Sequence, residues 1–248
     1  MDPIRTTAAV MVVTAITTAV VTGLRLEHPW LQPWAVLRAT VQLGVLSLVL
    51  GGVITNLAWT SAFLALMVAA ACATVHGRLR GTGRSSVLRI TAALVPSAAV
   101  PVGVVFALGA LPTEPRYLLA IGGIVVGGAM TAATLMGRAL FSSFVASRGE
   151  IEAWLALGAT PRRAARDATR AAASMALVPA TDQTRTTGLV TLPGAFVGAV
   201  FAGSSPLDAA QFQVIVLAGV LCTGALTVML FTWFFGAPTT LSTPAAHE

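Results

Sequence analysis

The sequence contains no lysine, and all 15 of its basic residues are arginine. A phosphate-binding P-loop requires the lysine of the G-x-x-x-x-G-K-[ST] motif. The absence of lysine therefore excludes a P-loop ATPase, and the chain is not expected to be an enzyme. Any ATP hydrolysis linked to its function must come from another subunit.

Charged residues of either sign are scarce. They make up 10% of the 248 residues, whereas soluble domains carry roughly a quarter. In hydrocarbon every backbone N–H and C=O must be satisfied internally, so long uncharged runs must be helices or a closed barrel. The run from Ile121 to Met136 lacks the alternation of barrel strands. The sequence therefore predicts an all-α integral membrane protein.

Groups that could hold a metal or perform catalysis are also few. Cys72 and Cys222 both lie inside apolar runs, which favours buried small hydrophobes over a disulfide or a metal pair. His28, His76 and His247 lie in loops or the tail, far apart in the sequence. We therefore predict no metal site and no catalytic site in this chain.

Long apolar runs fill most of the remaining sequence. A membrane-spanning helix needs roughly 20 mostly apolar residues. We predict about seven such spans within a single transmembrane domain over 1–248. They are placed near 4–24, 35–55, 57–75, 90–111, 117–137, 187–204 and 211–235.

The arginines predict the orientation in the membrane. Four of them fall at 76–89 and seven at 138–185, and cytoplasmic loops carry an excess of basic residues. Both segments are therefore expected in the cytoplasm, with the N-terminus outside and the C-terminus inside a cell (inner or plasma) membrane. Arg5 near the N-terminus opposes this orientation. The net charge of +6 then reflects topology, and no nucleic-acid partner is expected.

The segment 138–185 is predicted to form a cytoplasmic coupling element. Positions 149–157 favour a short helix, and Gly158 suits the left-handed position that ends it. Thr160 and Pro161 are typical of an N-cap and first helical position. A short helix, a sharp turn and a longer returning helix would present a rigid projection to a cytoplasmic partner. We call this projection, at 149–160, the knob.

The knob resembles the E-A-A-x-x-x-G loop of ABC transporter permeases. Glu152, Ala153 and Gly158 match that pattern, while Trp154 replaces its second alanine. A larger, collinear resemblance links the chain to the UPF0014 family of FetB-type permeases. It is carried by LRATVQL at 37–43, by LVPATDQTRTTGLVTLPG from Leu177, and by AGSSPLDAAQFQ from Ala202.

This resemblance implies a permease that pairs with a separate ABC ATPase subunit, which binds ATP and Mg²⁺. It implies a complex of two permeases and two ATPases, so the chain would form a homodimer in the lipid bilayer. Bacterial members resemble iron-export components, and plant relatives are linked to aluminium tolerance. After Gly194 the family often has methionine, threonine and glutamine. Ala195 and Phe196 stand here instead, which argues against a metal substrate.

Two sets of site residues follow. The ATPase-coupling set comprises Glu150, Glu152, Ala153, Trp154, Leu157, Gly158 and Ala159. The carboxylates could pair with basic groups of the partner, and Trp154 could be a buried anchor. The alternative is an amphipathic helix on the bilayer, with the tryptophan at the interface.

The permeation-path set comprises Arg38, Gln42, Asp182, Gln183, Arg185, Thr191, Pro193 and Gly194. Ionisable groups at membrane depth often mark a pathway, and a helix broken at Pro193 would be tolerated where it lines a cavity. Other interpretations remain open. Arg38 could snorkel to the headgroups, and Gln42 could bond across helices. Asp182 and Arg185 could pair within a kink after Pro179.

Two other functions compete with the permease. An ion-coupled secondary transporter would place acidic residues inside its spans, and none lies between the ends of the predicted spans. A non-transporting membrane scaffold would need no cavity. The 191–198 region would then be ordinary packing.

Overall fold

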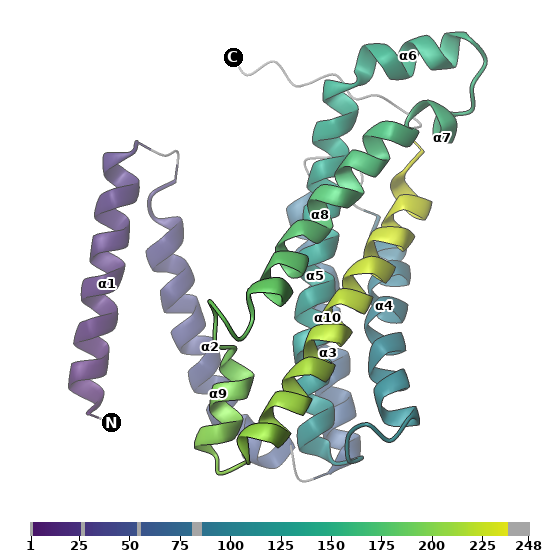
Figure 1. The fold of residues 1–248 in the computed structure, drawn as a ribbon. Coiled ribbons are helices and arrows are strands. Elements are labelled where there is room, and N and C mark those ends of the chain that lie inside the picture. The colour runs from purple at the N-terminus through teal and green to yellow at the C-terminus, as the bar shows by residue number, and fades with distance from the viewer. Residues whose placement is uncertain (1, 26–27, 54–55, 81–85, 238–248) are drawn as a thin grey trace. The chain divides into compact units, whose positions relative to one another are not determined.

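The computed structural model describes residues 2–25, 28–53, 56–80 and 86–237. Within these ranges the chain is helical, and its only strand-like pairing is one bridge between Thr187 and Thr191 (Figure 1). The predicted all-α membrane architecture is confirmed. The chain divides into two compact units, Met1–Asn56 and Leu57–Glu248. The prediction of a single domain over 1–248 stays a prediction.

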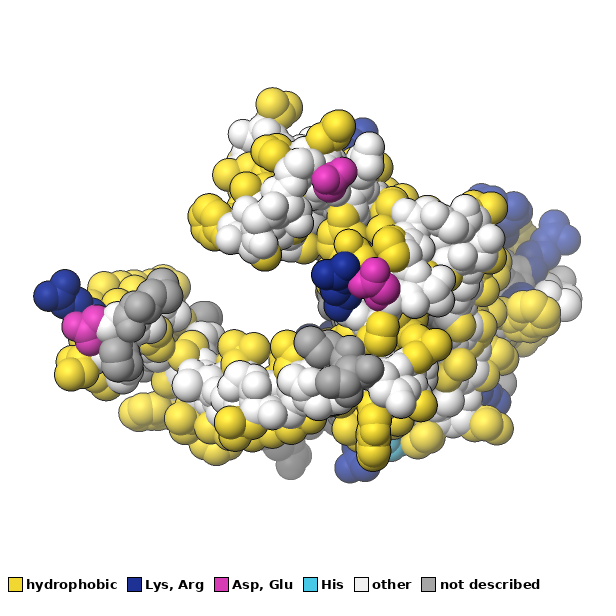
Figure 2. Space-filling view, turned by 90° about the horizontal axis from the view of Figure 1, so that it is seen from below, with side chains coloured by type: hydrophobic (Ala, Val, Ile, Leu, Met, Phe, Trp, Pro, Cys, Tyr) yellow, Lys and Arg dark blue, Asp and Glu magenta, His cyan; other side chains and the backbone are white. Residues whose placement is uncertain are grey.

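The first unit is a pair of helices, α1 (Pro3–Gly23) and α2 (Leu31–Val53), that pack against each other. Each is more than 20 residues long, so each spans about 30 Å at 1.5 Å per residue. Apolar side chains such as Met11 and Leu48 stay exposed along both helices. Figure 2 shows hydrophobic side chains spread over much of the visible surface, with charged side chains in only a few places. Such surfaces suit lipid, whose tails are as apolar as leucine.

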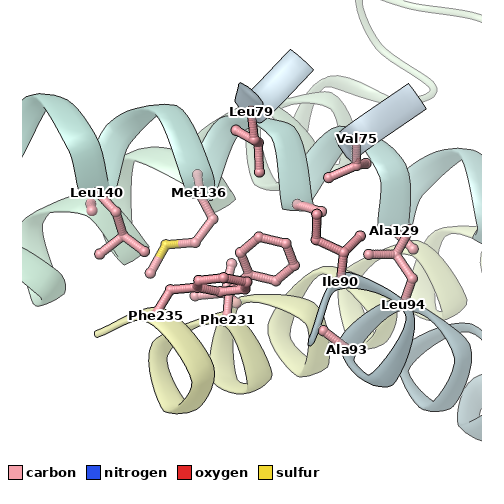
Figure 3. Packing of buried hydrophobic residues seen from close by; sticks show 14 of the residues in the cluster. Val75, Leu79, Ile90, Ala93, Leu94, Ala129, Met136, Leu140, Phe231 and Phe235 are labelled. Carbon is pink, nitrogen blue, oxygen red and sulfur yellow. The ribbon is translucent and has the colours of Figure 1, made fainter. Parts of the chain in front are cut away.

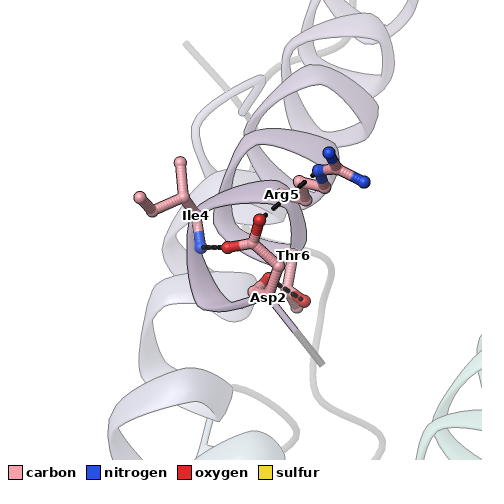
Figure 4. Close-up of polar contacts among 4 residues, drawn as sticks. All are labelled: Asp2, Ile4, Arg5 and Thr6. Carbon is pink, nitrogen blue, oxygen red and sulfur yellow. Dashed lines mark hydrogen bonds and ion pairs between the residues drawn. The ribbon is translucent and has the colours of Figure 1, made fainter.

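The start of α1 is fixed by Asp2 (Figure 4). Its carboxylate accepts the backbone N–H of Ile4 at 3.1 Å and pairs with Arg5 Nε at 3.4 Å. The Thr6 hydroxyl donates to the Asp2 carbonyl oxygen at 3.1 Å. An N-cap carboxylate satisfies a backbone donor that the first helical turn leaves free. Arg5 is the arginine that opposed the predicted orientation, and its ion pair with Asp2 offsets its charge at this end of α1.

The second unit is a bundle built around the long helix α5. Its helices are α3 (Leu57–Leu79), α4 (Val87–Ala107), α5 (Pro115–Ala146), α6 (Arg148–Ala156), α7 (Pro161–Ala164), α8 (Arg166–Thr186), α9 (Gly194–Phe201) and α10 (Pro206–Phe235). Helix α5 packs against α3, α4, α8 and α10, and α8 also packs against α10. Helices α6 and α7 lie at one end of the bundle, and α9 lies at the other (Figure 1).

The core of the second unit lies between α3, α4, α5 and α10 (Figure 3). The rings of Phe231 and Phe235 on α10 pack in a tilted arrangement with centroids 5.1 Å apart, and Figure 3 places them beside Met136 of α5. Gly137 of α5 packs against Leu79 of α3, and a Cβ atom at that glycine would lie 2.6 Å from both Leu79 δ carbons. Leu79 is fully buried, so it has little room to move. The glycine therefore permits the close approach of α3 and α5.

Six helices among the described residues are long and apolar enough to cross a membrane: α1, α2, α3, α4, α5 and α10. They correspond to six of the about seven predicted spans. The expected span at 187–204 is not among them. That stretch holds a loop and then α9, whose eight residues extend only about 12 Å. Helix α8 returns the chain along the bundle instead, beside α5 and α10 (Figure 1).

The segment 138–185 is therefore divided in a way the sequence did not predict. Residues up to Ala146 continue α5, and α8 begins at Arg166 and packs along the bundle. Only α6, α7 and their connecting turns extend beyond the bundle. Helix α8 continues through Pro179 to Thr186, so this proline does not end the helix. Packing against α5 and α10 holds the helix together despite the N–H that proline lacks.

Candidate functional site

A cavity of about 370 Å³ lies between α5, α8, α10 and the start of α9. Small residues on the facing helices leave this space open. Gly127 of α5 and Gly194 of α9 line it, and a Cβ atom at either position would meet no other atom within 4 Å. Pro179 and Ala180 of α8 form part of the opposite wall. The cavity lies entirely within the second unit.

The polar groups of the cavity are neutral amides and hydroxyls. Gln183 and Thr184 reach it from α8, Thr131 from α5 and Gln213 from α10. The hydroxyl of Thr184 donates to the Ala180 carbonyl oxygen at 2.8 Å, within its own helix. The Thr131 hydroxyl bonds its own helix in the same way. Both hydroxyl oxygens therefore keep lone pairs that a bound molecule could use.

Gln213 is the most unusual of these groups. It is only 6% exposed, and its Oε1 atom has no hydrogen-bond partner among the described residues. A buried polar atom left without a partner costs about 1–3 kcal/mol. Such groups call for an explanation beyond packing, and ligand binding is one. Gln213 is therefore the strongest candidate for a direct contact to a molecule in the cavity.

The structure brings together only part of the predicted permeation set. Gln183, Pro193 and Gly194 line the cavity. Asp182 and Arg185 are exposed and lie outside its lining, and the described part of the chain contains no ion pair between them. Three of the eight residues therefore share one site.

The remaining members of that set lie elsewhere. Thr191 is exposed in the loop before α9, where its carbonyl oxygen accepts the N–H of Gly188 at 2.9 Å. Arg38 and Gln42 are one turn apart on α2 of the first unit, and both side chains are exposed. Sequence reasoning missed Gln213. The available signal was an amide flanked by Phe212 and Val214 inside a predicted span.

The predicted knob forms as expected. Helix α6 ends at Ala156, and Gly158 adopts a left-handed backbone with φ of 83°. The N–H of Ala159 bonds the Trp154 carbonyl oxygen at 3.0 Å, and the N–H of Gly158 bonds that of Leu155 at 2.9 Å. These two bonds define a Schellman motif, which fixes the direction of the chain after the helix. The turn is therefore rigid.

The segment after the turn differs from the predicted long returning helix. Thr160 has the backbone of an N-cap and Pro161 occupies the first helical turn, as predicted. The Thr160 side chain makes no capping bond, and α7 is only four residues long. The long returning helix then begins afresh at Arg166.

The surface of α6 offers both charged and apolar groups. Ile151 is 1% exposed and anchors the helix to the bundle. Glu152 pairs with Arg148 of the same helix, with Nε and Oε1 2.7 Å apart, while Glu150 is exposed. Trp154 is 43% exposed and Leu157 is 81% exposed. Next to the turn, Trp154 of α6 and Leu157 after it thus present exposed apolar side chains that a partner or lipid could contact.

No group of three or more histidine, cysteine, aspartate or glutamate side chains capable of holding a metal occurs in the described part of the chain. Cys72 is buried in the core and Cys222 is exposed on α10, and both are free thiols. The cavity lining, all of it within the described ranges, includes no carboxylate, imidazole, thiol or thioether.

Six helices long and apolar enough to cross a membrane, a cavity between α5, α8, α9 and α10, and a knob at one end of the bundle define a polytopic helical membrane protein. The chain belongs to the family described as Uncharacterised protein family (UPF0014), which matches residues 5–238. The family resemblance predicted from the sequence is thereby confirmed. No solved structure gives a significant match to the chain.

Several relatives are similar over much of their length. The UPF0014 membrane protein STAR2 of Oryza sativa subsp. japonica is 32% identical over 235 residues, covering 94% of this chain and 81% of the relative. The Arabidopsis thaliana protein ALUMINUM SENSITIVE 3 is 31% identical over 227 residues, covering 91% and 81%. The probable iron export permease protein FetB of Escherichia coli K12 is 32% identical over 138 residues, covering 56% and 53%.

Proposed function

We propose that this chain is the membrane-spanning permease subunit of an ABC transporter. A separate ATPase subunit binds ATP and Mg²⁺, and its hydrolysis cycle drives a small solute or a metal ion through the permease. The likeness to a probable iron export permease supports this class and supports iron export as the first activity to test. Two permeases and two ATPases form the working complex.

The observation that carries this proposal is the continuity between the knob and the cavity. A single residue, Ser147, separates the end of α5 from the start of α6. Its N–H bonds the Ser143 carbonyl oxygen, and its own carbonyl oxygen accepts the Ile151 N–H. Beyond the Schellman turn, α7 leads into α8. Because α5 and α8 form two walls of the cavity, a displacement of α6 by the ATPase moves both walls.

The lining of the cavity bears on the substrate. Amides and hydroxyls bind a hydrated ion, a ligand-bound ion or a polar solute through hydrogen bonds, and they hold a bare transition metal weakly. A weak site suits passage, because conduction requires that the bound species also leaves. We therefore propose that an exported metal ion moves with its own ligands or water.

The orientation follows from the same elements. Eight of the 15 arginines lie on the end of α3, the start of α4, the C-terminal part of α5, α6, α7 and the start of α8, all at one end of the bundle (Figure 1). We place this end in the cytoplasm by the positive-inside rule. The C-terminus is then cytoplasmic and the N-terminus external, as expected from the sequence.

Affinity purification of the tagged chain from its native membrane in mild detergent tests the proposal. A nucleotide-binding subunit should co-purify in a one-to-one ratio and hydrolyse ATP. The double substitution Glu152→Arg with Gly158→Leu should lower its recovery at least about tenfold, because it reverses a charge and strains the turn at the interface. Glu114→Arg at the far end of α5 is the matched charge reversal and should leave recovery unchanged.

Each alternative function predicts a different result. A chain recovered alone in several detergents, without ATPase activity, contradicts the permease assignment. Transport driven by an ion gradient in vesicles without ATP would then indicate a secondary transporter. Stable partners without any transport would indicate a scaffold. Equal recovery of the ATPase with the double variant and the wild type would remove α6 from the interface.

A further inference from the structure

A second pocket, of about 770 Å³, lies at the α6 end of the second unit, away from the cavity described above. We call it the arginine pocket. It is formed by α7, the first turns of α8 and the last turns of α10. Its defining residues are Arg162, Arg163, Arg166, Thr169, Arg170 and Trp233. The proposed permease mechanism uses none of them.

The four guanidinium groups gather without acidic partners. No ion pair within the described ranges involves Arg162, Arg163, Arg166 or Arg170. Nη2 of Arg162 donates to the Trp233 carbonyl oxygen at 2.7 Å, which ties α7 to the end of α10. Each guanidinium carries five N–H donors, so most of them stay available. Like charges gathered in this way repel one another unless an anion lies between them.

The wall of the pocket holds a second, independent sign of a ligand. Thr169 is only 6% exposed, and its Oγ1 atom has no hydrogen-bond partner in the part of the chain that the structure describes. It lies in the first turns of α8, a helix of 21 residues whose N-terminus carries partial positive charge. A buried hydroxyl and a helix N-terminus beside several arginines suit the oxygens of a phosphate group.

The apolar part of the pocket lining indicates which kind of phosphate-bearing molecule would fit. Met229 and Trp233 of α10 line the pocket and are 54% and 64% exposed. Helix α10 is apolar enough to span the membrane, and a tryptophan near the end of a span marks the level of the headgroups. Basic groups thus adjoin an apolar surface at headgroup depth. A free phosphate would use only the arginines, whereas a phospholipid would use both.

We propose that the arginine pocket binds an anionic phospholipid, with the headgroup phosphate between the guanidinium groups and Thr169. The acyl chains lie along Met229 and Trp233 of α10. Basic pockets between helices at the cytoplasmic surface bind anionic headgroups in this manner. The bound lipid would hold α7 and the start of α8 against α10. It therefore stabilises the base of the knob without touching the cavity.

Native mass spectrometry of the delipidated full chain, titrated with phosphatidylglycerol or phosphatidylcholine, tests the proposal. Phosphatidylglycerol should bind at least about tenfold more tightly than phosphatidylcholine. The triple variant R163Q/R166Q/R170Q should lose at least about tenfold of that affinity. The matched control R80Q/R89Q/R138Q removes the same charge from the same end of the bundle and should lose less than about threefold.

A variant of unchanged charge covers the case in which the triple variant does not fold. Thr169→Val removes the hydroxyl alone and should lower phosphatidylglycerol affinity by about threefold to tenfold. An equal loss in the triple variant and its control would mean general electrostatic attraction and would overturn the site. Full displacement of the lipid by millimolar inorganic phosphate would make free phosphate the occupant and overturn the lipid assignment. Unchanged phosphatidylglycerol affinity in both Thr169→Val and R163Q would overturn the site itself.

Discussion

The hydroxyl of Thr223 on α10 donates a hydrogen bond to the backbone carbonyl oxygen of Ser97 on α4, at 2.5 Å. The Ser97 carbonyl is free to accept this bond because of a proline one turn further along α4. Pro101 has no N–H to give to the carbonyl four residues before it, which is that of Ser97. Thr227 adds a second bond, from its hydroxyl to Ser97 Oγ at 2.9 Å. A backbone acceptor freed by proline inside the bundle is thus satisfied by a neighbouring helix.

Thr223→Val should lower the free energy of unfolding by about 1 kcal/mol, because it leaves the buried Ser97 carbonyl without a donor. Pro101→Ala restores the N–H within α4, so in that background the same substitution should cost distinctly less. Thermal unfolding of the four proteins in detergent measures this coupling. Thr74→Val is the control, because its hydroxyl bonds Ala70 within its own helix. Additive effects of the two substitutions would contradict the proposed relation.

Gly137→Ala should destabilise the fold by about 1–3 kcal/mol, because the added methyl group would overlap the buried Leu79 side chain. Leu79→Ala should rescue part of this loss by making room. Gly103 lies in an open part of α4, and a Cβ atom there meets nothing within 4 Å. Gly103→Ala should therefore be neutral or slightly stabilising. Equal midpoints of unfolding for the two alanine variants would show that α3 and α5 are not closely packed at this point.

Gln213→Leu should keep or raise the thermal stability, because it removes a buried amide oxygen that has no partner in the described structure. It should lower transport in reconstituted vesicles at least about tenfold if the amide contacts the substrate. Gln211→Leu changes an exposed amide on the same helix and should leave transport unchanged. A clear loss of stability in Gln213→Leu would instead indicate a structural role.

Insertion of two glycines after Ser147 should separate docking from transport. The insertion leaves the surface of α6 intact but breaks the continuous bonding from Ser143 through Ser147 to Ile151. We expect the ATPase to co-purify at the wild-type level while transport falls at least about tenfold, because motion of α6 no longer moves α5. The same insertion after Thr113, in the turn before α5, is the control. Normal transport with the glycines after Ser147 would mean that coupling follows another route.

The sequence by itself determined the membrane class, the helical fold and the knob. These depend on local chemistry: uncharged runs of sufficient length, and a glycine, Gly158, at the end of α6 where the turn of the knob needs a left-handed backbone. The absence of lysine, which excludes a P-loop, can likewise be read directly from the sequence. The family could also be identified, because LVPATDQTRTTGLVTLPG and its neighbours are contiguous in the chain.

Tertiary structure decided the rest. Local hydropathy placed a span at 187–204, but packing against α5 and α10 gives the return path to the polar-faced helix α8. The same packing carries α8 through Pro179 and brings Gln183 to the cavity while Asp182 and Arg185 stay outside it. Gln213 can be recognised as a candidate binding residue only because it is buried and its Oε1 atom has no partner among the described residues. Such properties depend on which helices face one another, and no single segment of the sequence contains that information.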